Sequence, residues 1–464
     1  MALSGRGPLS LASAAVAQGG SVVRREPRWT KPIVVLVLVV WLIPIKSYKL
    51  PIGLPFNLEI YRLVIILLGA AWLVCLALGS AQVSTGGRAR VLGALVVGAV
   101  ASLAVNLSAI DSAGLQTQAV KSLSFFLSYV LAFVLVSSLI REVDDVVKVV
   151  QALVLGAAAV AAAALWESRM HVNLFDHLHS VLPFLVHFGR SNQNVNGGAL
   201  RVRASAQHPI ALGCALTMCV PLALHLSTRA ATAAHRRLWL AAAGLVLLGA
   251  MATVSRTVIL MLLAMLVCAF WLYGTRLLRY WPMLLILAVA THFAAPGVVS
   301  HIYKRFTPKG GVVGQLDSRA GMRGSGRIAD LGPGLSDWLK SPLVGHGLGT
   351  VAATGDSLAA TPTSAVAGPP IIFDDQYMNT LVSLGAVGLI SVLVFIWGSV
   401  RRLGTAARRT AGQDGALLAA CAVSAAGFGA GMATFDAFTF VQATLVFFII
   451  VALGLRVRAA AAEA

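Results

Sequence analysis

Charged side chains stand at the boundaries between polar and apolar segments of this sequence. Arg201 and Arg203 precede the apolar stretch 208–226, and Arg256 lies between two apolar stretches that leave no room for a loop. A guanidinium stays charged and binds phosphate oxygens through two parallel hydrogen bonds. The three arginines therefore predict a site for a diphosphate. Snorkelling at a membrane surface is the simpler alternative for Arg201 and Arg203, and an exposed structural turn is the alternative for Arg256.

Two adjacent carboxylates, Asp374 and Asp375, come just before the apolar stretch that begins at Tyr377. Such a pair can act as a general base, as a metal ligand or as the N-cap of a helix. A carboxylate near cations stays ionised, and an ionised carboxylate can accept a proton from a hydroxyl group. We therefore predict that Asp374, Asp375 and Arg256 are catalytic, while the N-cap interpretation stays open.

Three further side chains are predicted to contact substrate, namely His208, His346 and Tyr377. His208 precedes Pro209, so it also fits the plain start of an apolar span. No outward-facing acidic cluster exists besides the aspartate pair, and we expect no metal site. The glycines of 310–349 form no phosphate-loop or dinucleotide fingerprint, and we expect no cofactor.

Composition indicates a membrane protein. Of the 464 residues, 58% are hydrophobic and 11% are charged, whereas a globular domain carries about 25% charged residues. We predict an all-α polytopic membrane protein with about 12 transmembrane helices and one long extracytoplasmic loop, because a bilayer is crossed by about 20 apolar residues in a helix. The predicted spans are 33–50, 58–80, 91–107, 122–140, 145–165, 208–226, 237–254, 257–273, 282–299, 377–399, 416–434 and 437–455.

The net charge of +19 is mainly a signal of topology, because Lys and Arg gather beside alternate ends of the spans. The positive-inside rule then predicts cytoplasmic termini, and no nucleic acid partner is expected. The predicted organisation is a disordered basic cytoplasmic tail at 1–31, a transmembrane domain at 32–456 with outer loops 166–207 and 300–376, and a cytoplasmic tail at 457–464.

Several motifs, taken in order, resemble one family. These are Arg201–Pro209, Ser255-Arg256 between two spans, Pro342–Gly349, Asp374–Tyr377 and Leu384–Gly388. Together they resemble the O-antigen ligase and O-antigen polymerase superfamily of polytopic membrane glycosyltransferases. The resemblance covers roughly residues 200–400 closely and the rest only by the number of spans.

The resemblance implies a reaction and roles for residues. Such enzymes move a glycan from a polyprenyl-diphosphate carrier to an acceptor hydroxyl at the outer membrane face. The family's diphosphate-binding arginines correspond to Arg201 or Arg203, to Arg256 and, before the Pro-Leu segment, to Arg327. Ligases of the lipopolysaccharide type have a histidine followed by asparagine where this chain has Asp374-Asp375, so polymerisation and transfer to another glycan or to protein stay open. The polymerases of shape, elongation and division are a further variant of this enzyme class.

The sequence thus predicts glycan transfer or polymerisation at the outer face of the bacterial cytoplasmic membrane, in cell-surface polysaccharide biosynthesis. The expected partners are a lipid-linked glycan donor on undecaprenyl or another polyprenyl diphosphate, a glycan or lipid-glycan acceptor, and the bilayer. The competing class is a membrane transporter or flippase of a polysaccharide pathway, which broken spans and charges at mid-membrane would favour. A structural partner within a polysaccharide machine is a third class.

Overall fold

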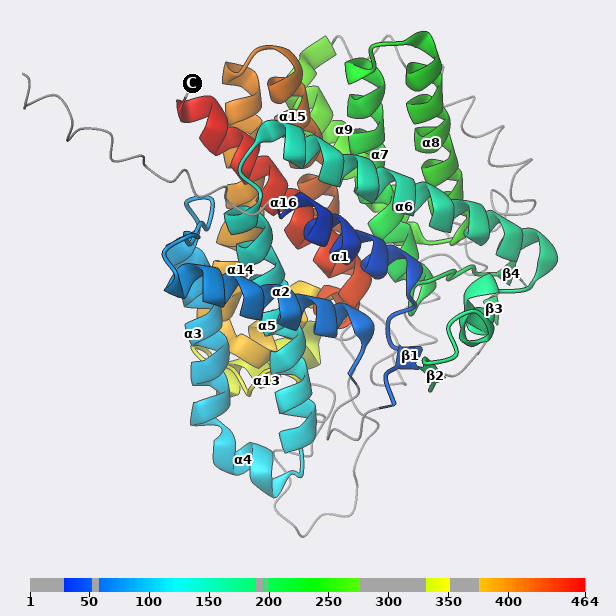
Figure 1. Ribbon diagram of the computed structural model, residues 1–464. Coiled ribbons are helices and arrows are strands. Elements are labelled where there is room, and N and C mark those ends of the chain that lie inside the picture. The colour runs from blue at the N-terminus through cyan, green and yellow to red at the C-terminus, as the bar shows by residue number, and fades with distance from the viewer. Residues whose placement is uncertain are drawn as a thin grey trace, which may run out of the picture.

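The computed structural model describes residues 29–51, 58–188, 195–196, 199–275, 331–350 and 375–463 of the chain. Within these ranges the fold is a bundle of helices (Figure 1). The helices are α1 Thr30–Leu42, α2 Ile60–Ala77, α3 Ala89–Val105, α4 Leu107–Ser112, α5 Gln116–Leu139, α6 Val143–Met170, α7 Pro209–Arg229, α8 Ala233–Ala252, α9 Arg256–Tyr273, α13 Leu331–Lys340, α14 Gln376–Arg409, α15 Gly412–Gly431 and α16 Val441–Glu463.

Short elements connect these helices. The two-residue strands β1 Tyr48–Lys49 and β2 Val186–His187 pair antiparallel, as do β3 Val195–Asn196 and β4 Ala199–Leu200. Three 3-10 turns complete the described residues, namely η1 Leu174–Ser180, η4 Met432–Thr434 and η5 Ala437–Thr439. The described elements are thus overwhelmingly helical, as predicted.

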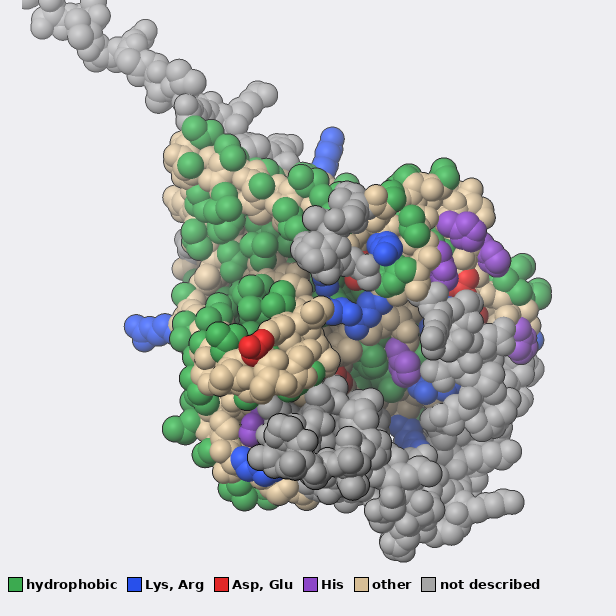
Figure 2. Space-filling model, turned by 90° about the horizontal axis from the view of Figure 1, so that it is seen from below, with side chains coloured by type: hydrophobic (Ala, Val, Ile, Leu, Met, Phe, Trp, Pro, Cys, Tyr) green, Lys and Arg blue, Asp and Glu red, His purple; other side chains and the backbone are tan. Residues whose placement is uncertain are grey.

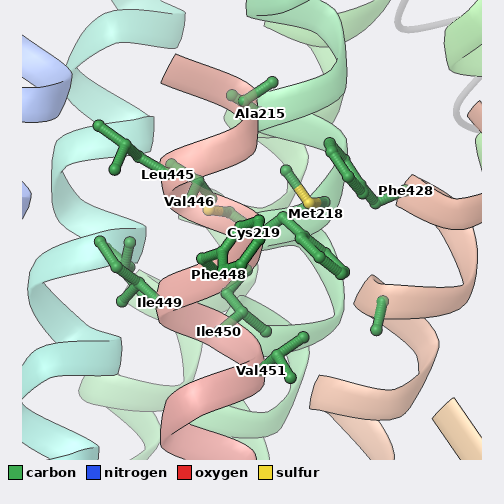
Figure 3. Packing of buried hydrophobic residues seen from close by; sticks show 14 of the residues in the cluster. Ala215, Met218, Cys219, Phe428, Leu445, Val446, Phe448, Ile449, Ile450 and Val451 are labelled. Atoms are coloured by element: carbon green, nitrogen blue, oxygen red, sulfur yellow. The ribbon is translucent and has the colours of Figure 1, made fainter. Parts of the chain in front are cut away.

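The centre of the bundle is α16, which packs against α5, α7 and α15. Its side chains are buried in nearly unbroken sequence, and Figure 3 shows Phe448 and Ile450 of α16 in the same packed cluster as Met218 of α7. A helix that is apolar on every side must be covered on every side. For α16 this cover is protein, because the other helices surround it (Figure 1).

Helices at the periphery expose apolar side chains instead. Leu67 and Leu73 of α2 and Val267 of α9 are each more than half exposed. Eight helices of the described residues are long and apolar enough to cross a membrane, and α1 and α3 are shorter apolar helices. Hydrocarbon tails solvate such surfaces at no cost, so the exposed apolar faces fit a multi-pass membrane protein.

Helices overlap eleven of the predicted spans, and the twelfth, 282–299, lies outside the described residues together with most of the loop 300–376. The number twelve therefore stays a prediction. One predicted boundary is wrong, because the span 33–50 is helical only to Leu42. Pro44 disfavours helix at the residue before it, and the chain then turns and pairs as β1.

Two other boundaries move outward. Trp166 and Glu167, which the sequence placed in an outer loop, belong to the last turn of α6. The predicted tail 457–464 continues α16 as helix to Glu463. Of the predicted N-terminal tail, 1–28 lies outside the described residues.

Candidate functional site

The turn between α15 and α16, residues 432–440, joins the N-terminal ends of several helices; we call it the α15–α16 turn. The backbone N–H of Phe438 donates to the Oε1 atom of Gln376, the first residue of α14, at 2.7 Å. The hydroxyl of Thr434 donates to the hydroxyl of Thr257, the second residue of α9, at 2.9 Å. The beginnings of α14 and α9 therefore meet at this turn, although more than 100 residues separate them in sequence.

The same turn holds the segment that leads into α7 and the segment that follows α1. The carbonyl oxygen of Thr439 accepts hydrogen bonds from Gln207 Nε2 at 2.9 Å and from Lys46 Nζ at 3.0 Å. The ring of Phe440 stacks on the ring of His208, with their centroids 5.2 Å apart. Residues from five parts of the chain thus converge on one end of the bundle.

Figure 2 views that end from below and shows Lys and Arg side chains bordering a hollow near its middle, with acidic and histidine side chains beside them. Helix N-termini also carry the positive end of the helix dipole, and the starts of α7, α9 and α14 lie at this end of the bundle. A hollow with both features is suited to anions, above all to phosphate groups.

Arg201 is one of the buried cations of this region, with 6% of its surface exposed. Its Nε atom donates to the carbonyl oxygen of Thr253 at 3.3 Å, and Thr253 stands three residues before Arg256. Arg256 is the first residue of α9 and is half-buried. The hydrogen bond brings the segment that carries Arg201 against the start of the helix that carries Arg256.

Arg203 lies in a different setting. Its guanidinium forms an ion pair of 2.6 Å with Asp176, and both side chains are largely buried. The carboxylate of Glu167 accepts the backbone N–H of Ala204 at 2.7 Å, and Ala204 adopts a positive φ of 42°. These contacts hold the loop that presents Arg201, so the geometry gives Arg203 a candidate role in positioning that loop.

His208 is neutral at physiological pH. Its Nδ1 atom accepts the backbone N–H of Ile210 at 3.2 Å and so caps α7. Burial, and then the charge of Arg201, lower the pKa of His208 to about 4. A neutral imidazole adds no positive charge to the hollow, so any contact of His208 with substrate is that of a neutral ring.

At the start of α14, one predicted catalytic residue acts as a cap. Asp375 Oδ1 accepts the backbone N–H of Tyr377 at 2.8 Å, so the N-cap interpretation is confirmed for Asp375. The hydroxyl of Tyr377 donates to the carbonyl oxygen of Gly429 at 2.6 Å, which ties α14 to α15. Asp374 and Arg327 lie outside the described residues.

His346 belongs to a backbone interlock that the sequence did not predict. At Gly385 the helix α14 breaks with a positive φ of 67°, and the segment 342–347 fills the break. The N–H groups of His346 and Gly347 donate to the carbonyls of Val382 and Ser383, each at 3.0 Å.

The glycines of this interlock are required by space as well as by conformation. A Cβ atom on Gly385 would lie 2.2 Å from the carbonyl oxygen of Leu343, and one on Gly345 would lie 2.4 Å from the carbonyl carbon of Ser383. The His346 Nε2–H donates to the carbonyl oxygen of Asp337 at 2.8 Å, which binds α13 to the same joint. The segment 342–347 of the predicted motif thus joins α13 to the break in α14, which is a structural role within the described residues.

Sequence reasoning missed Lys46, Glu59 and Arg62, which flank α1 and α2 at the same end of the bundle. The signal was available, because ionisable residues at the ends of apolar segments are costly and point to function. The partners lie far apart in sequence, and only the fold shows their convergence.

Comparison with known proteins bears on this geometry. Residues 241–393 match the O-antigen ligase family. The match supports the predicted resemblance to the O-antigen ligase and O-antigen polymerase superfamily over this third of the chain. None of the curated proteins matches the chain.

The O-antigen ligase domain includes Arg256, the interlock of 342–349 and Asp375, whereas Arg201, Arg203 and His208 precede it. The domain supports a membrane-embedded, glycosyltransferase-like enzyme of cell-surface polysaccharide biosynthesis. A multi-pass protein of the bacterial cytoplasmic membrane agrees with the apolar helices.

Proposed function

We propose that this O-antigen ligase-like protein moves a glycan from a polyprenyl-diphosphate carrier to an acceptor hydroxyl, by ligation or polymerisation. The reaction takes place at the outer face of the cytoplasmic membrane. The observation that carries the proposal is the meeting of the starts of α7, α9 and α14 at the α15–α16 turn. It brings the segments of Arg201 and Arg256 to the end of the bundle where Lys and Arg side chains border a hollow (Figure 2).

Arg201 and Arg256 bind the diphosphate of the carrier. When the glycan leaves, negative charge grows on the diphosphate, and this leaving group needs charge neutralisation more than it needs a proton. Fixed guanidinium groups provide that neutralisation without reorganising during the reaction. The N-termini of α7 and α9 add to the positive potential at the same place. Arg327 is a further candidate for this task.

Asp374 is the general base. The acceptor oxygen attacks the anomeric carbon of the glycan, the bond from that carbon to the diphosphate breaks, and the hydroxyl proton passes to the carboxylate of Asp374. One carboxylate oxygen of Asp375 caps α14. Its first task is therefore to fix the start of the helix that follows Asp374 in sequence. This role needs an ionised carboxylate, and cations near a carboxylate keep it ionised.

The test is transfer by purified protein in liposomes, with a polyprenyl-diphosphate-linked glycan as donor. We expect Arg256→Ala to lower the transfer rate by at least about 100-fold and Arg256→Lys to restore part of it. Arg229→Ala is the matched control, because Arg229 pairs with Asp144 at the opposite end of α7 and its loss should leave transfer unchanged.

Full transfer activity in Arg256→Ala, with normal insertion into the membrane, would refute the proposed role. Donor flux across the liposome without any glycan product would favour the transporter instead.

A further inference from the structure

A second group of cations lies on the other flank of the α15–α16 turn, formed by the α1–α2 connection and α5. Arg62 stands in the first turn of α2, and its guanidinium lies 4.2 Å from the ring centroid of Phe125. Lys46 follows α1, and its ammonium lies 5.2 Å from the same centroid. Two cations share one aromatic ring here, and Arg62 is among the charged groups that act on Lys46.

Among the residues that the structure describes, Arg62 forms no ion pair although it is 93% buried, and the carboxylate of Glu59 acts on it only through its charge. Its Nε atom donates to the hydroxyl of Tyr61 at 2.9 Å. In the part of the chain that the structure describes, neither terminal nitrogen of Arg62 forms a hydrogen bond or an ion pair. Buried arginines are almost always paired. The two terminal NH2 groups of the Arg62 guanidinium are therefore available to bind an external anion.

Lys46 is held in an unfavourable backbone conformation that directs its side chain to the same place. Its φ of 61° lies in the left-handed region, which side chains other than glycine seldom adopt. The carboxylate of Glu59 fixes this conformation by accepting the backbone N–H of Lys46 at 2.6 Å. Such strain persists where surrounding structure enforces it, most often at functional sites.

The local balance of charge is positive. The charged groups acting on Lys46 are the carboxylates of Glu59 and Asp436 and the cations Lys121 and Arg62. With Lys46 itself, three cations face two carboxylates. One of these carboxylates, Glu59, is already engaged by the backbone. The cluster can thus accept a further negative charge.

We propose that Lys46 and Arg62 bind an oxyanion, a phosphate or a carboxylate, carried by the acceptor. This inference rests on the proposed function, in which Arg201 and Arg256 hold the donor. The carbonyl oxygen of Thr439 accepts hydrogen bonds from both Lys46 and Gln207, so Lys46 lies beside the segment that leads from Arg201 into α7. An acceptor anchored at Lys46 and Arg62 would present its hydroxyl to a donor across that turn.

Two kinds of acceptor carry such a group near the membrane surface. A second lipid-linked glycan offers a diphosphate, and its use makes the enzyme a polymerase. A glycan with an acidic sugar offers a carboxylate instead. The shared chemistry is an oxyanion that a guanidinium can bind through two hydrogen bonds.

Native mass spectrometry of the purified full-length protein distinguishes these sources, with farnesyl diphosphate and methyl glucuronide as probes. If the acceptor carries a diphosphate, we expect the wild type to bind two molecules of farnesyl diphosphate. Arg62→Gln and Lys46→Gln should then lower the affinity for one of the two farnesyl diphosphate molecules at least tenfold. Arg256→Gln should lower the affinity for the other. If the acceptor carries a carboxylate, Arg62→Gln and Lys46→Gln should lower the affinity for methyl glucuronide at least tenfold. One molecule of farnesyl diphosphate should then still bind.

Lys148→Gln removes one positive charge at an exposed site on α6 and should bind both probes as the wild type does. Arg62→Lys should retain part of the binding. If Arg62→Gln does not fold, Lys46→Gln decides. Wild-type affinity for both probes in the Lys46 and Arg62 variants would overturn the inference and leave Arg62 a structural partner of Phe125. Unchanged binding in Arg256→Gln would instead contradict the proposed donor site.

Discussion

Two segments of the O-antigen ligase domain, both taken from the sequence as parts of one site, differ in what they contribute. The start of α9 brings the half-buried Arg256 close to the α15–α16 turn. The segment 342–349 contributes backbone groups that complete the broken helix α14. A family motif can thus supply side chains to a proposed active site, or it can supply backbone groups that hold two helices together. The two cases differ in whether side chains or peptide groups form the contacts. Variants that remove only the charge of a side chain, and variants that change only the backbone packing at a glycine, test this distinction.

The largest expected effect comes from the aspartate pair. Asn caps a helix as well as Asp does, so Asp375→Asn should keep the cap and lower transfer less than tenfold. Asp374→Asn removes the proposed base, and we expect a loss of about 100-fold or more. Initial rates of transfer in liposomes provide the measurement. Equal losses in the two variants would contradict the assignment of separate tasks.

A large loss of stability is expected at the interlock. Gly385→Ala introduces a Cβ atom 2.2 Å from the carbonyl oxygen of Leu343 at a residue with positive φ, and should destabilise the fold by about 3 kcal/mol. Gly98→Ala is the control, because its Cβ meets nothing within 4 Å in α3. Thermal unfolding in detergent compares them. A Gly385→Ala protein as stable as Gly98→Ala would show that the interlock does not hold α14.

The pH dependence of acceptor binding should reveal Lys46. Burial lowers the pKa of Lys46 to about 8. The negative charges of Glu59 and Asp436 raise this pKa, and the positive charges of Lys121 and Arg62 lower it further. The ammonium is present below this pKa, so the charged fraction falls from about 90% at pH 7 to about 10% at pH 9. We expect the acceptor KM to rise across this range while Lys46→Arg keeps it nearly constant. A Lys46→Arg protein with the same pH profile as the wild type would contradict this role.

The smallest effect is expected at Arg203. Because its charge is engaged by Asp176, Arg203→Gln should lower transfer less than tenfold, whereas Arg201→Gln should lower it about 100-fold. The double variant Arg203→Gln with Asp176→Asn should recover some of the loss, since it removes the unpaired carboxylate. A loss at Arg203 as large as that at Arg201 would place both arginines on the diphosphate.

Much of the fold follows from local sequence. The starts of α7, α9 and α14 lie within one residue of the predicted boundaries, because Pro209, Ser255 and Asp375 stand where a helix is expected to begin. The end of α1 was misplaced because apolar residues continue past Pro44, and hydropathy does not distinguish helix from an apolar turn.

The site was less predictable than the fold. Arg201 and Arg256 could be predicted as site residues because charge at an apolar boundary is itself a signal. The engagement of Arg203 by Asp176 and the sharing of Phe125 by Lys46 and Arg62 depend on tertiary contacts, which have no local pattern. The break in α14 at Gly385 was hidden for the same reason, since its partner segment 342–347 lies about 40 residues earlier.

The position of the donor's diphosphate tests the central claim most directly. In an experimental structure of the protein with bound polyprenyl diphosphate, the account predicts phosphate oxygens about 3 Å from the guanidinium groups of Arg201 and Arg256. The diphosphate would then lie beside the α15–α16 turn. A diphosphate bound only at the opposite end, in the cavity lined by Arg229 and His235, would contradict it.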